Sequence, residues 1–394
     1  MQISQAQEKF RIVGYVMQRN IPLLSDHELS MITHLEIAFI NPDENGNLIF
    51  GPYLGGGNFT EGEIPISTAV GKAKKYGVKT AVSLAGGGFW GDLTMINRYR
   101  KLMNDENRPQ FIANLVEYID DNNLDGIDID IEGDCINEYL GVFMKELSDT
   151  CHKRDWEVTA AWSGAGQWAD MLSDTALAYV DYLYIMSYDA TGAWAPNKLG
   201  PHAPYDKAIK DIQYYKKRNV NSERIVLGLP FYGRSFEAGV TSPLYREIVG
   251  MQNDAYQKDQ IGKLWYDGQP MIKKKTELAI NESCSGIMIW EITMDIRGKK
   301  SLLNEAYINS LNQNCIPHQI KISIEDNEII LSNLPKEKIQ LITILDENDT
   351  FLKSFIYKRI KQEDEYTKIK LKKYLNKKLI IKTNRAYYQI ILGE

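Results

Sequence analysis

Residues 124–133 read L-D-G-I-D-I-D-I-E-G, and this stretch constrains the fold more than any other part of the chain. From Ile127 to Glu132 the residues alternate strictly, which is the period of a β-strand. Alternation places Asp128, Asp130 and Glu132 on one face and three isoleucines on the other. Like charges resist ionising together, so carboxyls gathered in a poorly solvated space are typical of proton chemistry or metal binding. We therefore expect a strand whose apolar face packs on helices; a merely solvated strand face is the structural alternative.

Around this strand, β-type and helix-type patterns alternate along most of the chain. Strands are expected over 10–16, 34–40, 78–84, 157–163, 182–188, 224–231 and 285–290. Helices are expected over 26–32, 66–76, 109–122, 140–154 and 205–218. Repeated alternation of this kind is the pattern of a parallel α/β sheet or barrel. A (β/α)8 barrel takes about 250 residues or more, so a chain of 394 residues has room for one barrel and a smaller domain.

From Pro317 onward the helical pattern stops and short alternating runs appear. Turn-forming sequences such as D-N and D-E-N-D separate these runs. We interpret this part as a β-sandwich of about 75 residues. The expected organisation is thus an α/β barrel over residues 1–315 and an all-β accessory domain over residues 316–394.

The acidic strand resembles the D-G-x-D-x-D-x-E signature of family 18 glycoside hydrolases, which include chitinases and endo-β-N-acetylglucosaminidases. In that family the signature forms the fourth strand of a (β/α)8 (TIM) barrel. Four further family motifs follow the right order: S-L-A-G at 83–86, M-S-Y-D at 186–189, G-L-P-F-Y-G-R at 228–234 and S-G-I-M-I-W at 285–290. Two departures are Ile131, where many members carry Trp or Tyr, and Ala85, where a glycine is usual.

The resemblance implies substrate-assisted hydrolysis, in which the substrate's 2-acetamido oxygen attacks the anomeric carbon and gives an oxazolinium intermediate. Glu132 would act as general acid and then as base. Asp130 would orient the acetamido N–H, and Asp128 would share a proton with Asp130. Tyr188 would donate its hydroxyl to the acetamido carbonyl. Asp125 lies on the opposite parity of the strand, so we expect a structural role for it.

The resemblance also suggests which residues contact the sugar. Trp290 would form the floor of the sugar subsite, and further contacts are expected from Asp189, Met186, Tyr15, Trp194, Tyr232, Arg234 and Trp90. Aromatic faces suit the apolar faces of sugar rings, and polar groups then fix the register. For Trp90, packing on the barrel rim is an equally good interpretation.

Three functions remain open. The first is a chitinase-like hydrolase of β-1,4-linked N-acetylglucosamine, in chitin or its oligomers. The second is an endo-β-N-acetylglucosaminidase that cuts the chitobiose core of N-glycans. The third is a non-catalytic chitin-binding lectin on the same fold. About 50 residues separate the seventh and eighth strands, too few for the full α/β insertion of many processive chitinases, so we expect an open, shallower groove.

Composition limits the partners. A net charge of −6 argues against a nucleic-acid or anionic-membrane partner, and no apolar run of 18 residues indicates a membrane span. The four cysteines have no C-x-x-C or His-rich spacing, so a zinc site is not expected. The acidic strand has no Asn/Gly loop of the usual calcium geometry, and neither another metal nor a cofactor is expected. We expect a monomer whose partner is a glycan. The first residues have no leader pattern; we expect a secreted, periplasmic or cell-surface protein whose leader was removed, with a cytosolic protein as the alternative.

Overall fold

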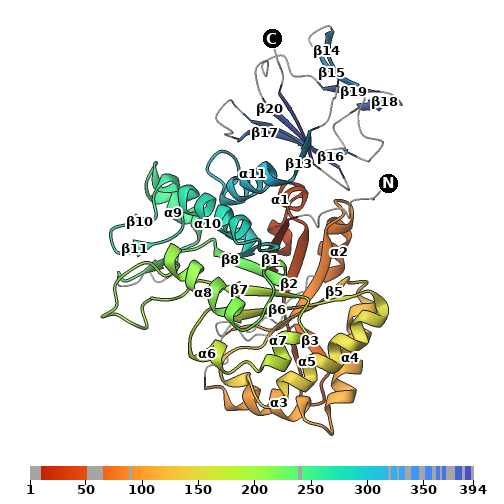
Figure 1. Ribbon diagram of the computed structural model, residues 1–394, viewed down its shortest axis with the longest axis vertical. Coiled ribbons are helices and arrows are strands. Elements are labelled where there is room, and N and C mark those ends of the chain that lie inside the picture. Colours follow the sequence, from red (N-terminus) through yellow and green to blue (C-terminus); the bar gives the residue numbers. More distant parts are fainter. Residues whose placement is uncertain are drawn as a thin grey trace.

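The computed structural model describes residues 10–50, 65–87, 91–237 and 242–317, and beyond these the strands that lie between residues 321 and 391. Its centre is a closed barrel of parallel strands (Figure 1). The barrel strands are β1 (Arg11–Met17), β2 (His34–Pro42), β4 (Lys79–Ala85), β5 (Gly126–Asp130), β6 (Glu157–Ser163), β7 (Tyr182–Met186), β8 (Ile225–Pro230) and β12 (Gly286–Trp290). Each strand pairs in parallel with the next in this order, and β1 pairs with both β2 and β12, which closes the barrel.

Helices follow the strands along the chain and cover the outside of the barrel (Figure 1). They are α1 (Asp26–Met31), α2 (Ile66–Lys74), α3 (Leu93–Met103), α4 (Arg108–Asp121), α5 (Leu140–Cys151), α6 (Gln167–Asp170), α7 (Asp174–Ala178), α8 (Tyr205–Lys217), α9 (Tyr245–Met251), α10 (Gln269–Asn281) and α11 (Leu302–Asn314). Short 3-10 turns occupy Gln18–Leu23, Gly133–Cys135, His152–Arg154, Ser222–Arg224, Ala255–Gln257 and Ile292–Met294. The expected (β/α)8 barrel is therefore confirmed. No helix among the described residues is long and apolar enough to span a membrane.

The expected strands and helices occur within one to three residues of their predicted ends, but sequence patterning missed several helices. Helix α10 is the clearest case, because two polar residues, Lys275 and Thr276, are fully buried on its inner face. The ammonium of Lys275 lies 2.5 Å from the carboxylate of Asp267. A buried ion pair of this kind removes the apolar periodicity by which an amphipathic helix is recognised.

Between β8 and β12 lies a small three-stranded sheet with helices α9 and α10 (Figure 1). Its strands are β9 (Arg234–Ser235), β10 (Gln260–Ile261) and β11 (Leu264–Trp265). These elements occupy the place where the sequence left no room for a full α/β insertion. A further short strand, β3 (Leu48–Phe50), pairs antiparallel with the end of β2.

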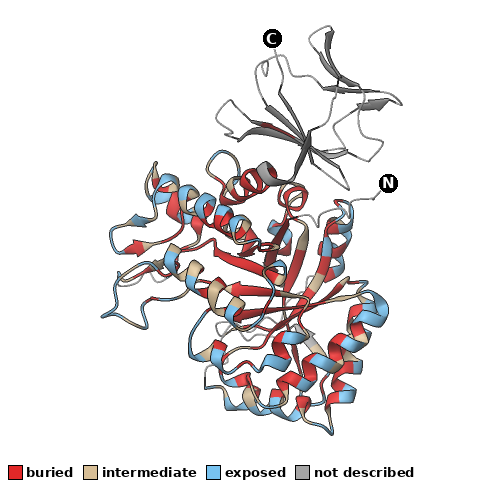
Figure 2. Cartoon of the chain, viewed as in Figure 1, coloured by how far each residue is buried: buried red, intermediate tan, exposed pale blue. Residues whose placement is uncertain are grey.

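Two layers of buried side chains flank the barrel strands, and buried residues mark these strands along their length in Figure 2. The outer layer lies between strands and helices and contains Ile127, Ile129 and Ile131, which are all fully buried. On the inward face, Asp128 is 0% exposed and Asp130 is 4% exposed. The acidic strand thus has the two predicted faces, and the solvated-face alternative is wrong. Asp125 accepts hydrogen bonds from the backbone and hydroxyl of Thr80, as expected of a structural residue.

An ionic cluster lies at the amino-terminal ends of the barrel strands, at the end of the barrel opposite Glu132. Arg11 donates to both carboxylate oxygens of Glu157, at 2.8 and 3.2 Å, and Lys79 lies 2.5 Å from the same carboxylate. Burial alone would raise the pKa of Glu157, but the hydrogen bond and charge of Arg11 outweigh it and lower that pKa to about 2. This end of the barrel is therefore held by paired charges.

The carboxyl-terminal strands form two further sheets. A five-stranded sheet has the order β13-β21-β20-β16-β17, and a four-stranded sheet has the order β14-β15-β19-β18. Their bounds are β13 (Cys315–Pro317), β14 (Lys321–Glu325), β15 (Glu328–Ser332), β16 (Ile339–Leu345), β17 (Phe351–Ile356), β18 (Lys361–Glu363), β19 (Tyr366–Ile369), β20 (Lys378–Thr383) and β21 (Tyr387–Ile391). Strands thus occur where short alternating runs were expected, whereas an all-β domain, its sandwich form and its boundary stay predictions.

Candidate active site

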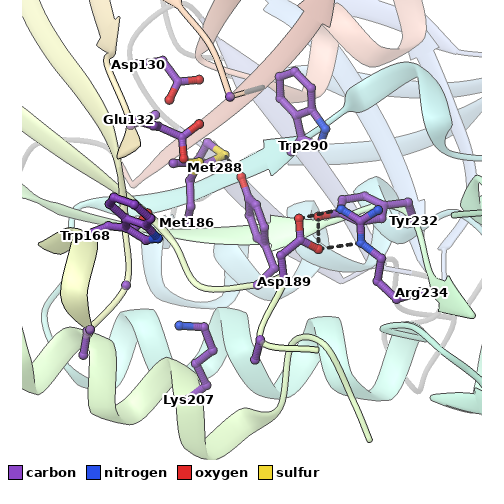
Figure 3. A pocket seen from close by; sticks show the side chains of 18 of the residues that line it. Asp130, Glu132, Trp168, Met186, Asp189, Lys207, Tyr232, Arg234, Met288 and Trp290 are labelled. Carbon is purple, nitrogen blue, oxygen red and sulfur yellow. Dashed lines mark hydrogen bonds and ion pairs between the residues drawn. The ribbon is translucent and has the colours of Figure 1, made fainter. Parts of the chain in front are cut away.

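A cavity of about 810 Å³ opens at the carboxyl ends of the barrel strands (Figure 3). Active sites of TIM-barrel enzymes lie at this end, because the loops after the strands converge there. The cavity is lined by ten residues that the sequence singled out: Tyr15, Asp130, Glu132, Met186, Tyr188, Asp189, Trp194, Tyr232, Arg234 and Trp290. Asp128 lies beneath them, and Trp90 falls outside the described residues. Segments far apart in the chain thus meet in one site.

The lining residues that sequence reasoning did not single out include the long or aromatic side chains Phe39, Trp168, Lys207 and Met288. Phe39 and Met288 lie on barrel strands, and Trp168 follows the fifth barrel strand. The position of Trp168 just after a strand is a signal that could have identified it, because such loops line the site. Lys207 lies two residues inside helix α8 and carries no such signal.

Asp128 sits in a ring of hydroxyl donors in the barrel interior. Tyr15 and Ser83 donate to its Oδ2 at 2.7 and 2.6 Å, and Thr159 donates to its Oδ1 at 2.8 Å. Burial raises the pKa of Asp128, and the three hydroxyl groups oppose that rise by stabilising the carboxylate. The donors come from β1, β4 and β6, so the closed barrel assembles this ring.

Asp130 and Glu132 continue the row toward the cavity. Burial raises the pKa of Asp130 well above its ordinary value, and the charges of Glu132 and Asp128 raise it further. Its Oδ1 has no hydrogen-bond partner in the described structure. Burial and the charge of Asp189 raise the pKa of Glu132 to about 8, although a hydrogen bond with Asp130 opposes the shift. Glu132 is thus a carboxyl that stays protonated at neutral pH, as a general acid requires.

Gly87 allows the loop after β4 to approach Glu132 closely. A Cβ atom at this position would lie 2.6 Å from Glu132 Oε1, closer than a Cβ carbon packs against another heavy atom. The glycine-rich run at the end of the third barrel strand therefore shapes the space beside the acid, as small residues at a strand end predict.

Tyr188 follows β7 and lines the cavity beside the carboxyl row. Burial raises the pKa of its phenol well above the ordinary value, and the charges of Asp130 and Asp189 add to the shift. The hydroxyl therefore stays protonated and can donate a hydrogen bond. Gly228 leaves room for the ring: a Cβ there would lie 3.0 Å from Tyr188 Cε1 and 2.4 Å from the carbonyl oxygen of Ile185.

Asp189 anchors the opposite side of the cavity (Figure 3). Arg234 donates to both carboxylate oxygens of Asp189, from Nε to Oδ1 at 2.7 Å and from Nη2 to Oδ2 at 2.6 Å. The hydroxyl of Tyr232 also donates to Oδ1, at 2.9 Å. Burial would raise the pKa of Asp189, but hydrogen bonds from His202 and Arg234 hold it well below its usual range. Asp189 is therefore a fixed anion and no proton donor.

Trp290 forms an aromatic surface with its neighbours. Its ring stacks on Phe39 with centroids 5.3 Å apart and contacts Tyr15 at 5.7 Å. Trp194 lies at the rim with 59% of its surface exposed, and the guanidinium of Arg234 lies 5.0 Å from its ring centroid. An apolar floor with polar groups around it suits a sugar ring. Among the described residues, no group of three or more His, Cys, Asp or Glu side chains is arranged to hold a metal ion.

The family model of glycosyl hydrolases family 18 matches residues 11–295, which include every barrel strand and the whole carboxyl row. The chain belongs to glycoside hydrolase family 18. Solved structures agree: the family 18 chitinase ChiB from the chitin utilization locus of Flavobacterium johnsoniae is 34% identical, with a TM-score of 0.70 over 78% of this chain and 96% of that chain. A chitinase from Bacteroides thetaiotaomicron is 26% identical, with a TM-score of 0.64 over 77% and 97% of the two chains.

A more distant solved structure shares the fold. A chitinase-like agglutinin from Robinia pseudoacacia is 22% identical, with a TM-score of 0.62 over 76% of this chain and 99% of that chain, a likeness of fold alone. Among curated sequences, "Probable chitinase 2" of Drosophila melanogaster is 25% identical over 57% of this chain. The match spans 58% of the length of that relative. The family and the chitinase-like character are therefore established, while the activity of the whole protein is a proposal.

Proposed function

We propose that this protein is a retaining hydrolase of β-1,4-linked N-acetylglucosamine, acting on chitin or its oligomers. The observation that carries the proposal is the row Asp128–Asp130–Glu132, which rises from the barrel core and ends in a cavity with Trp290 on its wall. Membership of family 18 and the likeness to chitinases of two bacteria support the substrate class.

In the proposed mechanism the sugar that will be cleaved lies against Trp290. Glu132, protonated at neutral pH, gives its proton to the glycosidic oxygen while the substrate's acetamido oxygen attacks the anomeric carbon. The bond to the leaving sugar breaks and an oxazolinium ion forms. Glu132, now ionised, takes a proton from a water molecule. The oxygen of this water attacks the anomeric carbon and opens the oxazolinium ring, and the configuration at that carbon is retained overall.

Asp130 and Tyr188 would act on the acetamido group. The Oδ1 atom of Asp130, buried and without a partner, can accept the amide N–H once the group arrives. The Tyr188 hydroxyl can donate to the acetamido oxygen, which positions it for attack. Asp128, which accepts from three hydroxyl groups, would share a proton with Asp130. The three carboxyls of the row would therefore titrate as a coupled set.

Product analysis on two substrates tests the proposal. Chitin oligosaccharides and a high-mannose N-glycoprotein are incubated separately with the wild type and with Glu132→Gln, which serves as the blank. Release of N-acetylglucosamine dimers from the oligomers supports a chitinase. Trimming of the glycoprotein alone moves the assignment to an endo-β-N-acetylglucosaminidase. Binding without either product identifies a lectin and overturns the enzyme.

We further propose that residues 316–394 form a separate β-sandwich module that acts as a spacer, and that the protein is a secreted, periplasmic or cell-surface monomer. The strands after residue 317 support a distinct all-β part. Removal of residues 316–394 that leaves the turnover of soluble oligomers unchanged would support the module. Measurement of the molar mass in solution tests whether the protein is a monomer. Cell fractionation of the native host tests its proposed location.

A further inference from the structure

The loop after β4 starts at a residue with an unusual backbone conformation. Ala85 ends β4 with a φ of 83°, in the left-handed region that residues with a side chain rarely adopt. The family 18 motif usually carries a glycine at this position, and glycine adopts such angles without steric cost. An alanine keeps this conformation only where the surrounding structure holds it.

Two buried side chains hold the carbonyl of Ala85. Asn41, near the end of β2, donates its amide N–H to that carbonyl at 3.2 Å. Tyr99 of helix α3 donates its hydroxyl to the amide oxygen of Asn41 at 2.8 Å. Asn41 is 1% exposed and Tyr99 is fully buried, so water does not compete for either bond. The backbone at Ala85 is therefore connected through Asn41 to a helix on the outside of the barrel (Figure 1).

The two glycines after Ala85 contact the carboxyl row. The backbone N–H of Gly86 donates to the carbonyl oxygen of Asp130 at 3.0 Å. Gly87 lies against the side chain of Glu132, since a Cβ at its position would be 2.6 Å from Glu132 Oε1. The dihedral angles of Ala85 set the direction in which these glycines leave the strand. They therefore determine how closely the loop approaches Glu132.

Helix α3 also supports the chain on the other side of Glu132. The turn Gly133–Cys135 directly follows the acid, and α3 packs against this turn. Cys135 is 1% exposed, so the turn is covered by protein. Glu132 thus lies between two segments that the same helix supports, and Tyr99 is the side chain of that helix that reaches Asn41.

We propose that Asn41 and Tyr99 are positioning residues of the catalytic acid: they hold Ala85 in its left-handed conformation, and the loop then fixes the carboxyl of Glu132 beside the glycosidic bond. This rests on the proposed hydrolysis of N-acetylglucosamine linkages, in which Glu132 gives a proton to the leaving oxygen. Neither residue is among the described residues that line the cavity, so both act on turnover and not on sugar binding. A displacement of a reacting group by about 1 Å costs about 100-fold in rate.

Steady-state kinetics on the tetramer of N-acetylglucosamine test the proposal. In Asn41→Leu the side chain keeps its approximate size, but the carbonyl of Ala85 loses its donor. We expect kcat to fall by about 30-fold while KM stays within about twofold, because the acid moves and the cavity walls do not. Tyr99→Phe removes only the outer bond of the chain, so we expect kcat to fall by about threefold.

The Ala85→Gly background distinguishes positioning from a general loss of packing. Glycine adopts the left-handed conformation without steric cost, so Asn41→Leu in this background is expected to lower kcat by only about threefold. Asn304→Leu is the matched control. Asn304 is also 1% exposed and donates its amide to a backbone carbonyl, that of Gly298, away from the lining of the cavity. This control is expected to lower the melting temperature and to leave kcat unchanged.

A loss of kcat that is the same in the Ala85→Gly background, or wild-type kcat in Asn41→Leu, would overturn the proposal. If the wild type cleaves no oligomer, the proposed function fails, and NMR titration of the Glu132 carboxyl carbon then tests the positioning separately. Burial is the main cause that raises the pKa of Glu132 to about 8. Displacement of the loop admits water, so the midpoint should fall by about one pH unit in Asn41→Leu. An unchanged midpoint rejects the positioning role.

Discussion

Tyr15 of β1 donates its hydroxyl to Asp128 of β5 at 2.7 Å, across the interior of the barrel. Both side chains are almost completely buried, and the ring of Tyr15 also contacts Trp290. One tyrosine thus touches the base of the carboxyl row and the aromatic surface of the cavity. Because β1 and β5 are far apart in the sequence, only barrel closure brings these groups together.

Removal of this hydroxyl should weaken the carboxyl row. In Tyr15→Phe, Asp128 loses one of three hydroxyl donors, so its pKa rises further and kcat/KM on chitin oligomers falls by about tenfold. Steady-state kinetics measure the change. Tyr184→Phe is the matched control, since it removes another buried hydroxyl, which donates to Glu36. An equal loss in both variants would assign the effect to general core packing.

The pH profile should report the proton on Glu132. The acid must be protonated to act, and its pKa is raised to about 8. We therefore expect kcat/KM of the free enzyme to fall as the pH rises through about 8, measured with a chitin oligomer, whose sugar leaving group needs that proton. A decline that begins near pH 5 would contradict the elevated pKa.

The same shift should make stability depend on pH. Glu132 has an ordinary pKa of 4.5 when unfolded and about 8 when folded, so between these values the folded state holds more protons. Its contribution to stability is complete below pH 4.5 and is lost as the pH rises to about 8. Thermal unfolding of Glu132→Gln should show a smaller decline across this window than the wild type, and parallel declines would refute the assignment.

Asp189 should set the pH at which kcat/KM falls on the alkaline side of the profile, here called the alkaline limb. Its negative charge raises the pKa of Glu132, so Asp189→Asn is expected to lower that pKa and to move the limb to lower pH. Arg234 loses its partner in this variant and pushes the pKa in the same direction. The pH profile of kcat/KM measures the shift. Asp181→Asn changes a carboxylate that pairs with His152 outside the cavity and should leave the limb in place.

A side chain at Gly87 should displace the carboxyl of Glu132. In Gly87→Ala the new Cβ would meet Glu132 Oε1 at 2.6 Å, so the acid must move and turnover should fall by about 100-fold. Gly71→Ala is the control: Gly71 lies in α2 with nothing within 4 Å of a Cβ, and alanine there should stabilise the fold by up to about 1 kcal/mol. Kinetics and thermal unfolding distinguish the two changes. Full activity in Gly87→Ala would contradict this prediction, because it would show that the loop after β4 moves away and leaves Glu132 in place.

Glu157 should govern resistance to acid. Its pKa falls from 4.5 to about 2 on folding, so its stabilising contribution is present above pH 4.5 and is lost as the pH falls toward 2. Glu157→Gln leaves Arg11 without its carboxylate partner and should cost roughly 2 kcal/mol at pH 7, less for this partly exposed pair than for a fully buried one. Urea unfolding at pH 7 and pH 3 tests this, since the difference between variant and wild type should shrink at pH 3.

The sequence by itself determined the barrel, the acidic strand and most of the site. Strict alternation from Ile127 to Glu132 fixes which side chains share a face, because the period of a strand is a local property. The resemblance to family 18, rather than any local period, pointed to ten residues that line the cavity. Only the tertiary structure decided what each carboxyl experiences. The hydroxyl ring around Asp128, the ion pair of Asp189 and the hydrogen bonds from Ala165 and Ser187 to Asp211 join segments that are distant in the chain. Burial and electrostatic shifts depend on those distances in space.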